Sequence, residues 1–330
     1  MQIYICANLL LLGSSSVMFN ENKPSIAGIF PIVGSLAEYF ERRNLVVIDV
    51  GCRWGFADVW SLFGSHVTLI GFDPDPAECE RLKSTYQGSS DVHFVAKALA
   101  DSEGKLPLFL TAEPACSSLY KPDSSLTSSM PHLACAKLVG ETKVDLTTLD
   151  TWASSTGVNE VDFLKLDTQG SELGVLEGAE NCLQSIRALQ IEVEFNPIYL
   201  GQPLFSDIDS FLRKRGFVLW RLTNLCHYSS LPEASAFKHK DVQIFDGRVV
   251  PVSAQGGQLF WGEAYYVRKE IAYSEETSDW QACLRDGAII STLGFRDLAG
   301  SRLQQALHHA PSNIVPAINR VLTKYYSPLV

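Results

Sequence analysis

The sequence predicts an α/β fold in which helices cover a doubly wound, mostly parallel sheet with an antiparallel last strand and a C-terminal helical tail. From residue 45 to residue 222, short apolar runs typical of buried strands alternate with stretches of helical character. The first unit joins a strand, a glycine loop and a helical stretch, which is the plan of a nucleotide-type site. Acidic residues stand at or just past the ends of five predicted strands, where ligand sites of such sheets lie: Asp49, Asp73, Asp101, Asp167 and Glu194.

Short apolar runs predict the strands. The first two, at 45–48 and 67–72, lead directly into Asp49 and Asp73. The last two strands, which we expect to pair antiparallel, lie at 216–222 and 259–268. Between these pairs, we expect strands at 92–95, 105–110, 161–166 and 189–195.

Helical spacing, proline and glycine predict the helices. A proline in the first turn favours the helix at 74–83, and Gly216 ends the helix at 204–216. In the longest helix, at 171–186, apolar residues recur at helical spacing: Leu173, Leu176, Ala179 and Leu183. We expect shorter helices at 35–43, 56–63 and 149–153.

The glycine loop after the first strand differs from a dinucleotide loop. It has the pattern Asp49-x-Gly51-x-x-x-Gly55, whereas a pyrophosphate site needs Gly-x-Gly-x-x-Gly at a helix N-terminus. The bulky Arg53 and Trp54 stand inside the loop, and no Gly-Lys-Ser/Thr follows, which excludes a P-loop. The pattern suits a ligand without phosphates, such as S-adenosylmethionine (SAM). A structural turn that binds no ligand is the alternative.

An acidic residue lies 22 positions beyond the first glycine of this loop. Asp73 follows the second predicted strand, at about the distance where such folds bind a ribose. A carboxylate accepts two hydrogen bonds at once, so it suits a 2′,3′-diol and clashes with a 2′-phosphate. The loop and this acid together predict a nucleoside site.

Composition indicates a globular protein and excludes several classes. The 330 residues are 46% hydrophobic and 19% charged, which is enough for one large domain or two modest ones. The net charge of −10 argues against a nucleic-acid partner, which needs a basic face. The eight cysteines and seven histidines lack metal-ligand spacing, so we expect no metal site. Scattered thiols are typical of a reducing compartment, which predicts a cytoplasmic location.

The first 34 residues predict a partly disordered leader. The apolar run at 3–12 is too short to span a bilayer, so we expect no stable membrane span. No basic residue precedes the run, so a signal peptide lacks its charged region. Met18 is therefore a candidate for the native start, and a weak signal peptide is the alternative.

The remainder of the chain divides into one domain and a tail. We expect a nucleotide-binding domain over 35–269, with insertions at 111–143 and 225–258. The first insertion is rich in Ser and Pro, and its alternatives are a lid over the active site and a disordered segment. Residues 270–330 predict a helical extension that either caps the sheet or contributes to a homodimer contact.

A longer block resembles a known family. Residues 162–179, Asp-Phe-Leu-Lys-Leu-Asp-Thr-Gln-Gly-Ser-Glu-Leu-Gly-Val-Leu-Glu-Gly-Ala, are similar to the signature of FkbM-type SAM-dependent methyltransferases. Three shorter pieces match in order: Asp49-Val-Gly-x-x-x-Gly, Gly71-Phe-Asp-Pro-Asp-Pro76 and Ala98-Leu-Ala-Asp101. Residues 192–205 are similar to the stretch after the signature in one branch of the family. The resemblance covers residues 45–268.

The resemblance implies a class I methyltransferase (Rossmann-like) fold, SAM as methyl donor, and usually O-methylation of a hydroxyl. The acceptor it implies is a small molecule or glycan: a sugar, a cell-surface glycan or another secondary metabolite. For the donor site, it implies that Gly51 and Gly55 pass near the methionine part and that Asp49 orients the loop or the amino group of SAM. Asp73 is implied at the ribose. Three residues are implied at the adenine: Leu99, Ala100 and Asp101.

On the acceptor side, position and resemblance favour four residues. Glu194 is the preferred general base and His132 the second choice, with Asp167 and Glu172 beside them. Many members of the family have Glu at the position of Gln169, so no base is expected at that position.

Two other functions stay open at this point. An oxidoreductase or epimerase using NAD shares the strand, glycine loop and ribose acid, but this chain lacks the third glycine. A non-catalytic binding protein on a methyltransferase fold is the second alternative, against which the intact glycines and Asp73 argue.

Overall fold

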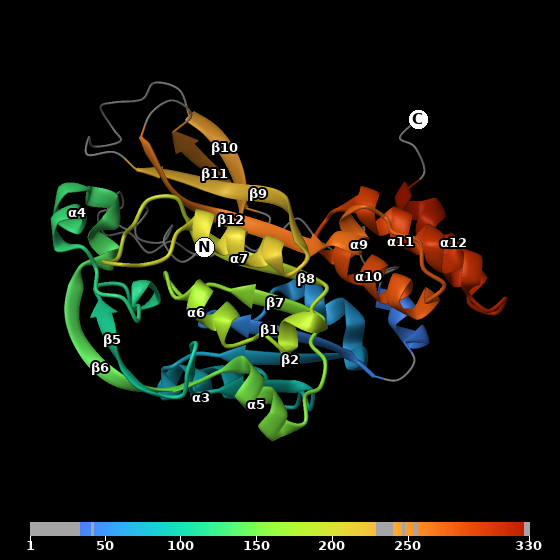
Figure 1. Cartoon of the computed structure of the whole chain (residues 1–330), viewed down its shortest axis with the longest axis horizontal. Coiled ribbons are helices and arrows are strands. Elements are labelled where there is room, and N and C mark those ends of the chain that lie inside the picture. The colour runs from blue at the N-terminus through green and yellow to red at the C-terminus, as the bar shows by residue number, and fades with distance from the viewer. Residues whose placement is uncertain (1–33, 41–42, 229–239, 246–247, 254–256, 327–330) are drawn as a thin grey trace.

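The computed structural model describes residues 34–40, 43–228, 240–245, 248–253 and 257–326. The expected leader and the candidate start at Met18 lie outside these residues. The described chain has the predicted α/β fold, with a seven-stranded sheet, a smaller three-stranded sheet beside it and helices on both faces (Figure 1).

The larger sheet has the strand order β3-β2-β1-β7-β8-β12-β9. The five strands from β3 to β8 are parallel, and β12 runs antiparallel between β8 and β9. This confirms the mostly parallel sheet with an antiparallel last strand. The bounds are β1 (Leu45–Val50), β2 (Val67–Phe72), β3 (Val92–Val95), β7 (Phe163–Leu166), β8 (Ala188–Glu194), β9 (Phe217–Tyr228) and β12 (Gln258–Arg268).

The smaller sheet contains a strand that the sequence pattern did not reveal. Strands β5 (Gly104–Thr111) and β6 (Leu138–Thr147) pair antiparallel, and β4 (Ala98–Leu99) joins β6 in parallel. The predicted insertion at 111–143 therefore includes the first part of β6. The first six residues of β6 are exposed, so pairing with β5 forms this part of the strand without apolar alternation.

Both predicted insertions contain regular elements. Between β5 and β6, the chain forms η4 (Pro114–Cys116), α4 (Ser124–Ser129) and η5 (Pro131–Ala136), in which η marks a 3-10 helix. In the second insertion, β10 (Lys240–Phe245) pairs antiparallel with β11 (Arg248–Ser253). Figure 1 shows α4 and the β5–β6 pair at one end of the molecule and the C-terminal helices at the other.

One face of the large sheet is covered by α5 (Leu149–Thr156), α6 (Glu172–Glu177), η6 (Cys182–Gln184) and α7 (Phe205–Lys214). The predicted helix at 171–186 is wrong in its length, because α6 ends at Gly178. A Cβ at Gly178 would meet the carbonyl oxygen of Ala100 at 2.1 Å, so the chain turns where only glycine fits.

The opposite face is covered by η2 (Ser35–Tyr39), η3 (Asp58–His66), α3 (Pro76–Thr85) and the C-terminal helices. The predicted helical stretch at 56–63 overlaps η3, which begins at Asp58 and consists of 3-10 turns interrupted at Gly64, whose φ is +53°. Asp75 caps α3 by accepting hydrogen bonds from the amides of Ala77 and Glu78, and Pro76 occupies its first turn.

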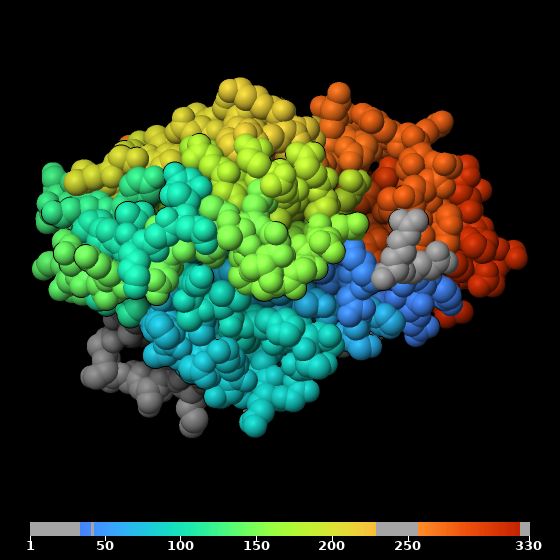
Figure 2. All heavy atoms as spheres, turned by 60° about the horizontal axis from the view of Figure 1, so that its bottom comes forward, coloured from blue at the N-terminus to red at the C-terminus, as the bar shows by residue number. Residues whose placement is uncertain are grey.

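The C-terminal tail is helical, as expected, and shares the main hydrophobic core. Buried residues such as Leu284 and Leu303 pack in one cluster with Leu45, Val47 and Phe163 of the sheet. The tail comprises α9 (Lys269–Ala272), α10 (Trp280–Thr292), α11 (Arg296–His309) and α12 (Val315–Tyr326). The segment around residue 40, drawn in blue, lies against these orange and red helices in both views (Figures 1 and 2).

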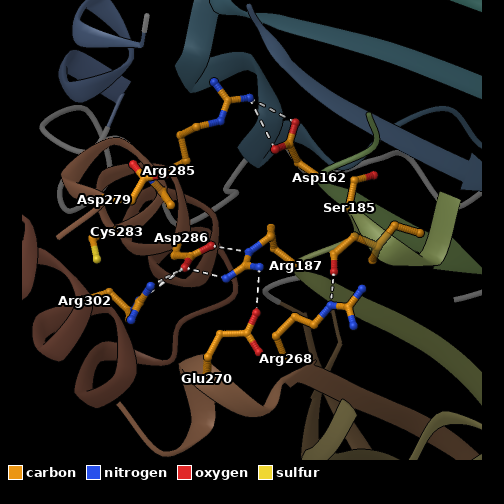
Figure 3. Close-up of polar contacts among 12 residues, drawn as sticks. Asp162, Ser185, Arg187, Arg268, Glu270, Asp279, Cys283, Arg285, Asp286 and Arg302 are labelled. Atoms are coloured by element: carbon orange, nitrogen blue, oxygen red, sulfur yellow. Dashed lines mark hydrogen bonds and ion pairs between the residues drawn. The ribbon is translucent and has the colours of Figure 1, made fainter. Parts of the chain in front are cut away.

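Buried ion pairs fasten the tail to the sheet (Figure 3). Asp286 on α10 accepts hydrogen bonds from Arg302 on α11 and from Arg187, which directly precedes β8. Asp162, which directly precedes β7, accepts from Arg285 in the same way. The tail is thus attached where β7 and β8 begin, at the edge opposite their carboxyl ends.

Replacing Asp286 with alanine is expected to lower the free energy of unfolding by about 3–5 kcal/mol, because it leaves the buried Arg302 without its counter-charge, while Arg187 keeps its ion pair with Glu270. Asp286 and Arg302 are each only 1% exposed, so water cannot take over the lost contacts. Urea unfolding measures the change. Glu276→Ala, at an exposed position in the preceding loop, is the matched control. Equal stability of the two variants would contradict a stabilising network.

No helix in the described part of the chain combines the length and the apolar character that a bilayer crossing requires.

Candidate active site

A cavity of about 480 Å³ opens at the carboxyl ends of the central strands. Its walls come from the residues that follow β1, β2 and β7, from residues 96–99, from the β5–β6 pair and from residues 114–119. The volume lies in the range of small-molecule sites. The smaller sheet therefore forms a wall of the site, with Leu108, Leu110 and Val144 facing the cavity.

The loop after β1 forms one wall through glycine. Gly51 has φ +83°, and a Cβ there would meet the carbonyl oxygen of Asp167 at 1.9 Å. The amides of Gly51 and Cys52 both donate to the carbonyl of Phe72, at 2.9 and 3.2 Å, which ties this loop to the end of β2. Gly51 therefore lets three strand ends converge and leaves backbone, not side chain, at the cavity.

The second loop glycine acts outside the cavity. Gly55 has φ +82°, and a Cβ there would meet the phenol oxygen of Tyr86 at 2.7 Å. Tyr86 in turn accepts a hydrogen bond from the amide of Phe56. Gly55 fits the loop against the end of α3 and is not among the residues that line the cavity.

Asp73 lies in the cavity wall, directly after β2. It is 5% exposed, and its Oδ1 accepts a hydrogen bond of 2.8 Å from the amide of Asp75. Burial raises the pKa of Asp73 to about 6. The carboxylate is thus held at the cavity in a fixed orientation, with ionisation close to the neutral range.

Asp49 supports the site from within the sheet. Its Oδ1 accepts from the Lys165 ammonium at 3.2 Å, and the same ammonium lies 3.6 Å from Oδ2 of Asp167. Burial raises the pKa of Asp49, and the charge of Lys165 opposes that shift. Asp49 is not among the lining residues, so the structure places it beneath the loops and not at the ligand.

Of the three residues expected at the adenine, one lines the cavity and two do not. Leu99 lines the cavity. Ala100 is buried, and its amide donates to the carbonyl of Thr147. Asp101 is exposed and lies outside the cavity, because the chain leaves the smaller sheet directly after this pairing. Residues 96–98, which sequence reasoning did not select, take its expected place in the wall.

Asp167 is the one acceptor-side residue of the four expected that lines the cavity. It follows β7, and its amide donates to the carbonyl of Val50. Glu172 is 1% exposed, and its oxygens accept from the amides of Thr168 and Gly170. Those contacts make Glu172 a support for the loop at 168–170 and engage the oxygens that a base would need.

Glu194 and His132 lie outside the cavity wall. Glu194 is buried, and burial, with the nearby Glu172 carboxylate, raises its pKa well above the usual range. Because Glu194 is buried outside the cavity wall, this geometry does not bring the expected base to the cavity. His132 stacks on Tyr228 with ring centres 5.5 Å apart, beside an apolar cluster under α4.

Sequence reasoning excluded a base at Gln169 and assigned this residue no other role. Gln169 contacts Asp167, Glu192, Tyr199 and Ser118 through its side chain and backbone. Its place two positions after Asp167 in the signature block was the available signal. Periodicity could not show it, because these contacts join elements far apart in the sequence.

The fold and this cavity define a class I methyltransferase. The sequence profile of the methyltransferase FkbM domain matches residues 49–219. The chain therefore belongs to the FkbM family of SAM-dependent methyltransferases. The site fits this donor, because Gly51 opens the loop and Asp73 lies in the cavity wall directly after β2, where such folds bind a ribose.

Comparison with solved structures finds distant likenesses. TrmK of M. capricolum in complex with S-adenosyl-homocysteine is 7% identical, with 89% of this chain and 95% of that chain covered and a TM-score of 0.32. A TehB-like SAM-dependent methyltransferase from Corynebacterium glutamicum is 12% identical, with coverages of 72% and 88% and a TM-score of 0.31. Precorrin-6y C5,15-methyltransferase from Geobacter metallireducens is 6% identical, with coverages of 77% and 94% and a TM-score of 0.34. No curated protein sequence matches the chain.

Proposed function

We propose that this methyltransferase transfers the methyl group of SAM to a hydroxyl oxygen of a sugar, glycan or other secondary metabolite. The observation that carries the proposal is the cavity itself. It joins a wall suited to a nucleoside, formed by Gly51 and Asp73, to a single carboxylate at the end of β7, Asp167. A hydroxyl acceptor needs both a donor pocket and a nearby proton acceptor.

In the donor half, the proposed contacts follow from the lining residues. Asp73 accepts two hydrogen bonds from the ribose diol, and the backbone at Gly51 passes close to the methionine part. Leu99 and the apolar side chains of the β5–β6 pair pack on the adenine. When bound, SAM supplies a methyl group that its sulfonium already activates.

In the acceptor half, the protein has two tasks. The walls hold the hydroxyl oxygen in line with the methyl carbon and the sulfur, and alignment of this kind contributes several kcal/mol. As the oxygen–carbon bond forms and the carbon–sulfur bond breaks, Asp167 takes the hydroxyl proton. A positioned base of this kind accelerates such a step by about 10²–10⁴-fold.

A panel of neutral sugars, uronic acids, glycans and small alcohols, incubated with methyl-labelled SAM, tests the proposal. We expect label on oxygen, located by mass spectrometry and NMR of the product. Matched amines and thiols of the same scaffolds are the control acceptors. Transfer to nitrogen, sulfur or carbon with no O-methyl product would overturn the proposed reaction.

SAM affinity is expected to fall as the pH drops through 6. Asp73 binds the diol best when ionised, and its pKa of about 6 means that the ionised form dominates above that pH and is lost below it. The dissociation constant should be level above pH 7 and rise by up to about tenfold per pH unit below 6. Calorimetry at stepped pH measures this. The Asp73→Asn variant, which has no proton to gain, should give a flat profile at weaker affinity; a flat wild-type profile would contradict the assignment.

A further inference from the structure

Gln169 is held in an unusual backbone conformation at the inner end of the cavity. Its φ is +59°, a left-handed value that non-glycine residues rarely adopt, and its side chain is 2% exposed. Four hydrogen bonds fix it there. Its carbonyl accepts from Ser118 Oγ at 2.6 Å, and its Oε1 accepts from the Tyr199 hydroxyl at 3.1 Å. Outliers of this kind occur where the surroundings impose them, often at functional sites.

The Gln169 amide nitrogen links two carboxyl groups. Nε2 donates to Asp167 Oδ1 at 3.1 Å and to Glu192 Oε2 at 2.5 Å. A primary amide has two N–H donors and a carbonyl acceptor, so it can bond two carboxyl oxygens and a phenol at the same time. A glutamate side chain of the same size would bring a third carboxyl to this point and has no N–H to donate.

We propose that Gln169 is the positioning residue that holds the Asp167 carboxylate towards the cavity, ready to take the acceptor's proton. This inference rests on the proposed function, in which Asp167 is the base. The proposal explains why the chain can have an amide at position 169. Gln169 does not take the proton but orients Asp167, which does. The contact from Ser118 extends the arrangement to the segment between β5 and β6, which forms the facing wall.

The state of Glu192 supports this division of roles. Burial, with the Asp167 carboxylate next, raises the pKa of Glu192 well above its usual range. This shift favours the neutral form of Glu192, which reduces the negative charge beside Asp167, and Glu192 Oε2 accepts from Nε2. Other titratable groups face this cluster from β1, β7, α6, β8 and the neighbouring loops: Asp49, Lys165, Glu172, Glu194, Tyr199 and Cys116.

The test compares two substitutions of Gln169 with a buried glutamine that does not contact Asp167. Gln169→Ala should lower kcat by about 10–100-fold, part of what the base supplies, with SAM affinity within threefold of wild type. Gln169→Glu keeps the size but adds a carboxyl, so the acidic limb of its pH–rate profile should move to higher pH, because neighbouring carboxyls resist ionising together. Gln202→Ala removes hydrogen bonds to the amides of Ile198 and Tyr199. The acidic limb of its pH–rate profile should stay at the wild-type pH.

A second readout does not need an acceptor. In protein labelled with ¹³C at Asp and Glu carboxyl carbons, the Asp167 and Glu192 signals, assigned with D167N and E192Q, should both move in Q169A and stay in place in Q202A. Unmoved signals, or a Q169E profile equal to wild type, would overturn the inference. The proposed function fails separately, if the labelled product of the acceptor panel is not an O-methyl compound.

Discussion

Replacing Asp73 with alanine is expected to abolish SAM binding. The carboxylate would accept two hydrogen bonds from the ribose, and charged hydrogen bonds are worth about 1.5–3 kcal/mol each, so their joint loss weakens affinity by at least about 100-fold. Asp73 lines the cavity and is oriented by the Asp75 amide, whereas Oδ1 of Asp75, the other acid at the end of β2, accepts from the Ala77 amide of α3.

Calorimetric titration of SAM measures the loss, and circular dichroism checks that the fold is intact. Glu80→Ala is the matched control, since Glu80 is an exposed acid on the adjacent α3 and lies outside the cavity. If the Asp73 variant bound SAM with wild-type affinity, while its fold was intact and the control variant behaved normally, the assignment of Asp73 to the SAM site would be wrong.

Asp167→Asn is expected to give the second large effect, on turnover and not on binding. The amide keeps the size of the side chain but cannot take the hydroxyl proton, so kcat should fall by about 10²–10⁴-fold. SAM affinity should stay within a few-fold of wild type, because the diol, adenine and methionine contacts are untouched. Single-turnover transfer of the labelled methyl group separates the chemical step from product release.

Glu194→Gln provides the comparison for that experiment. Burial raises the pKa of Glu194 well above its usual range and so favours the protonated acid, which a glutamine resembles in size. Turnover of this variant should therefore stay within a few-fold of wild type. The opposite ranking, with Glu194→Gln inactive and Asp167→Asn active, would return the base role to Glu194.

Much of the large sheet could be predicted, because its strands are short apolar runs that end in acids. β2 and β3 match the predicted bounds, and β1 and β8 differ by one or two residues at their ends. In the smaller sheet, β5 differs by one residue at each end. Burial produces the pattern in such strands, so the pattern reports the fold. β6 lacked the signal because its first half is exposed, and α6 was overestimated because Gly178 ends it through a contact with Ala100, 78 positions earlier.

The candidate site was predictable in its location and less so in its roles. The ends of β1, β2 and β7 bring Gly51, Asp73 and Asp167 to one cavity, as parallel topology requires. Which acid faces the cavity depends on packing against other elements: Asp167 lines the cavity, whereas Glu194 is buried outside its wall. The sequence contains no measure of this packing, so the preferred base was chosen on position and resemblance.

The C-terminal helices have a consequence for biosynthesis. Segments near residue 40 and residues beyond 280 share one hydrophobic cluster, and ion pairs join α10 to the starts of β7 and β8. A nascent chain emerging from the ribosome therefore exposes one side of its sheet until the last helices are made, and a truncated translation product should be captured by chaperones or degraded.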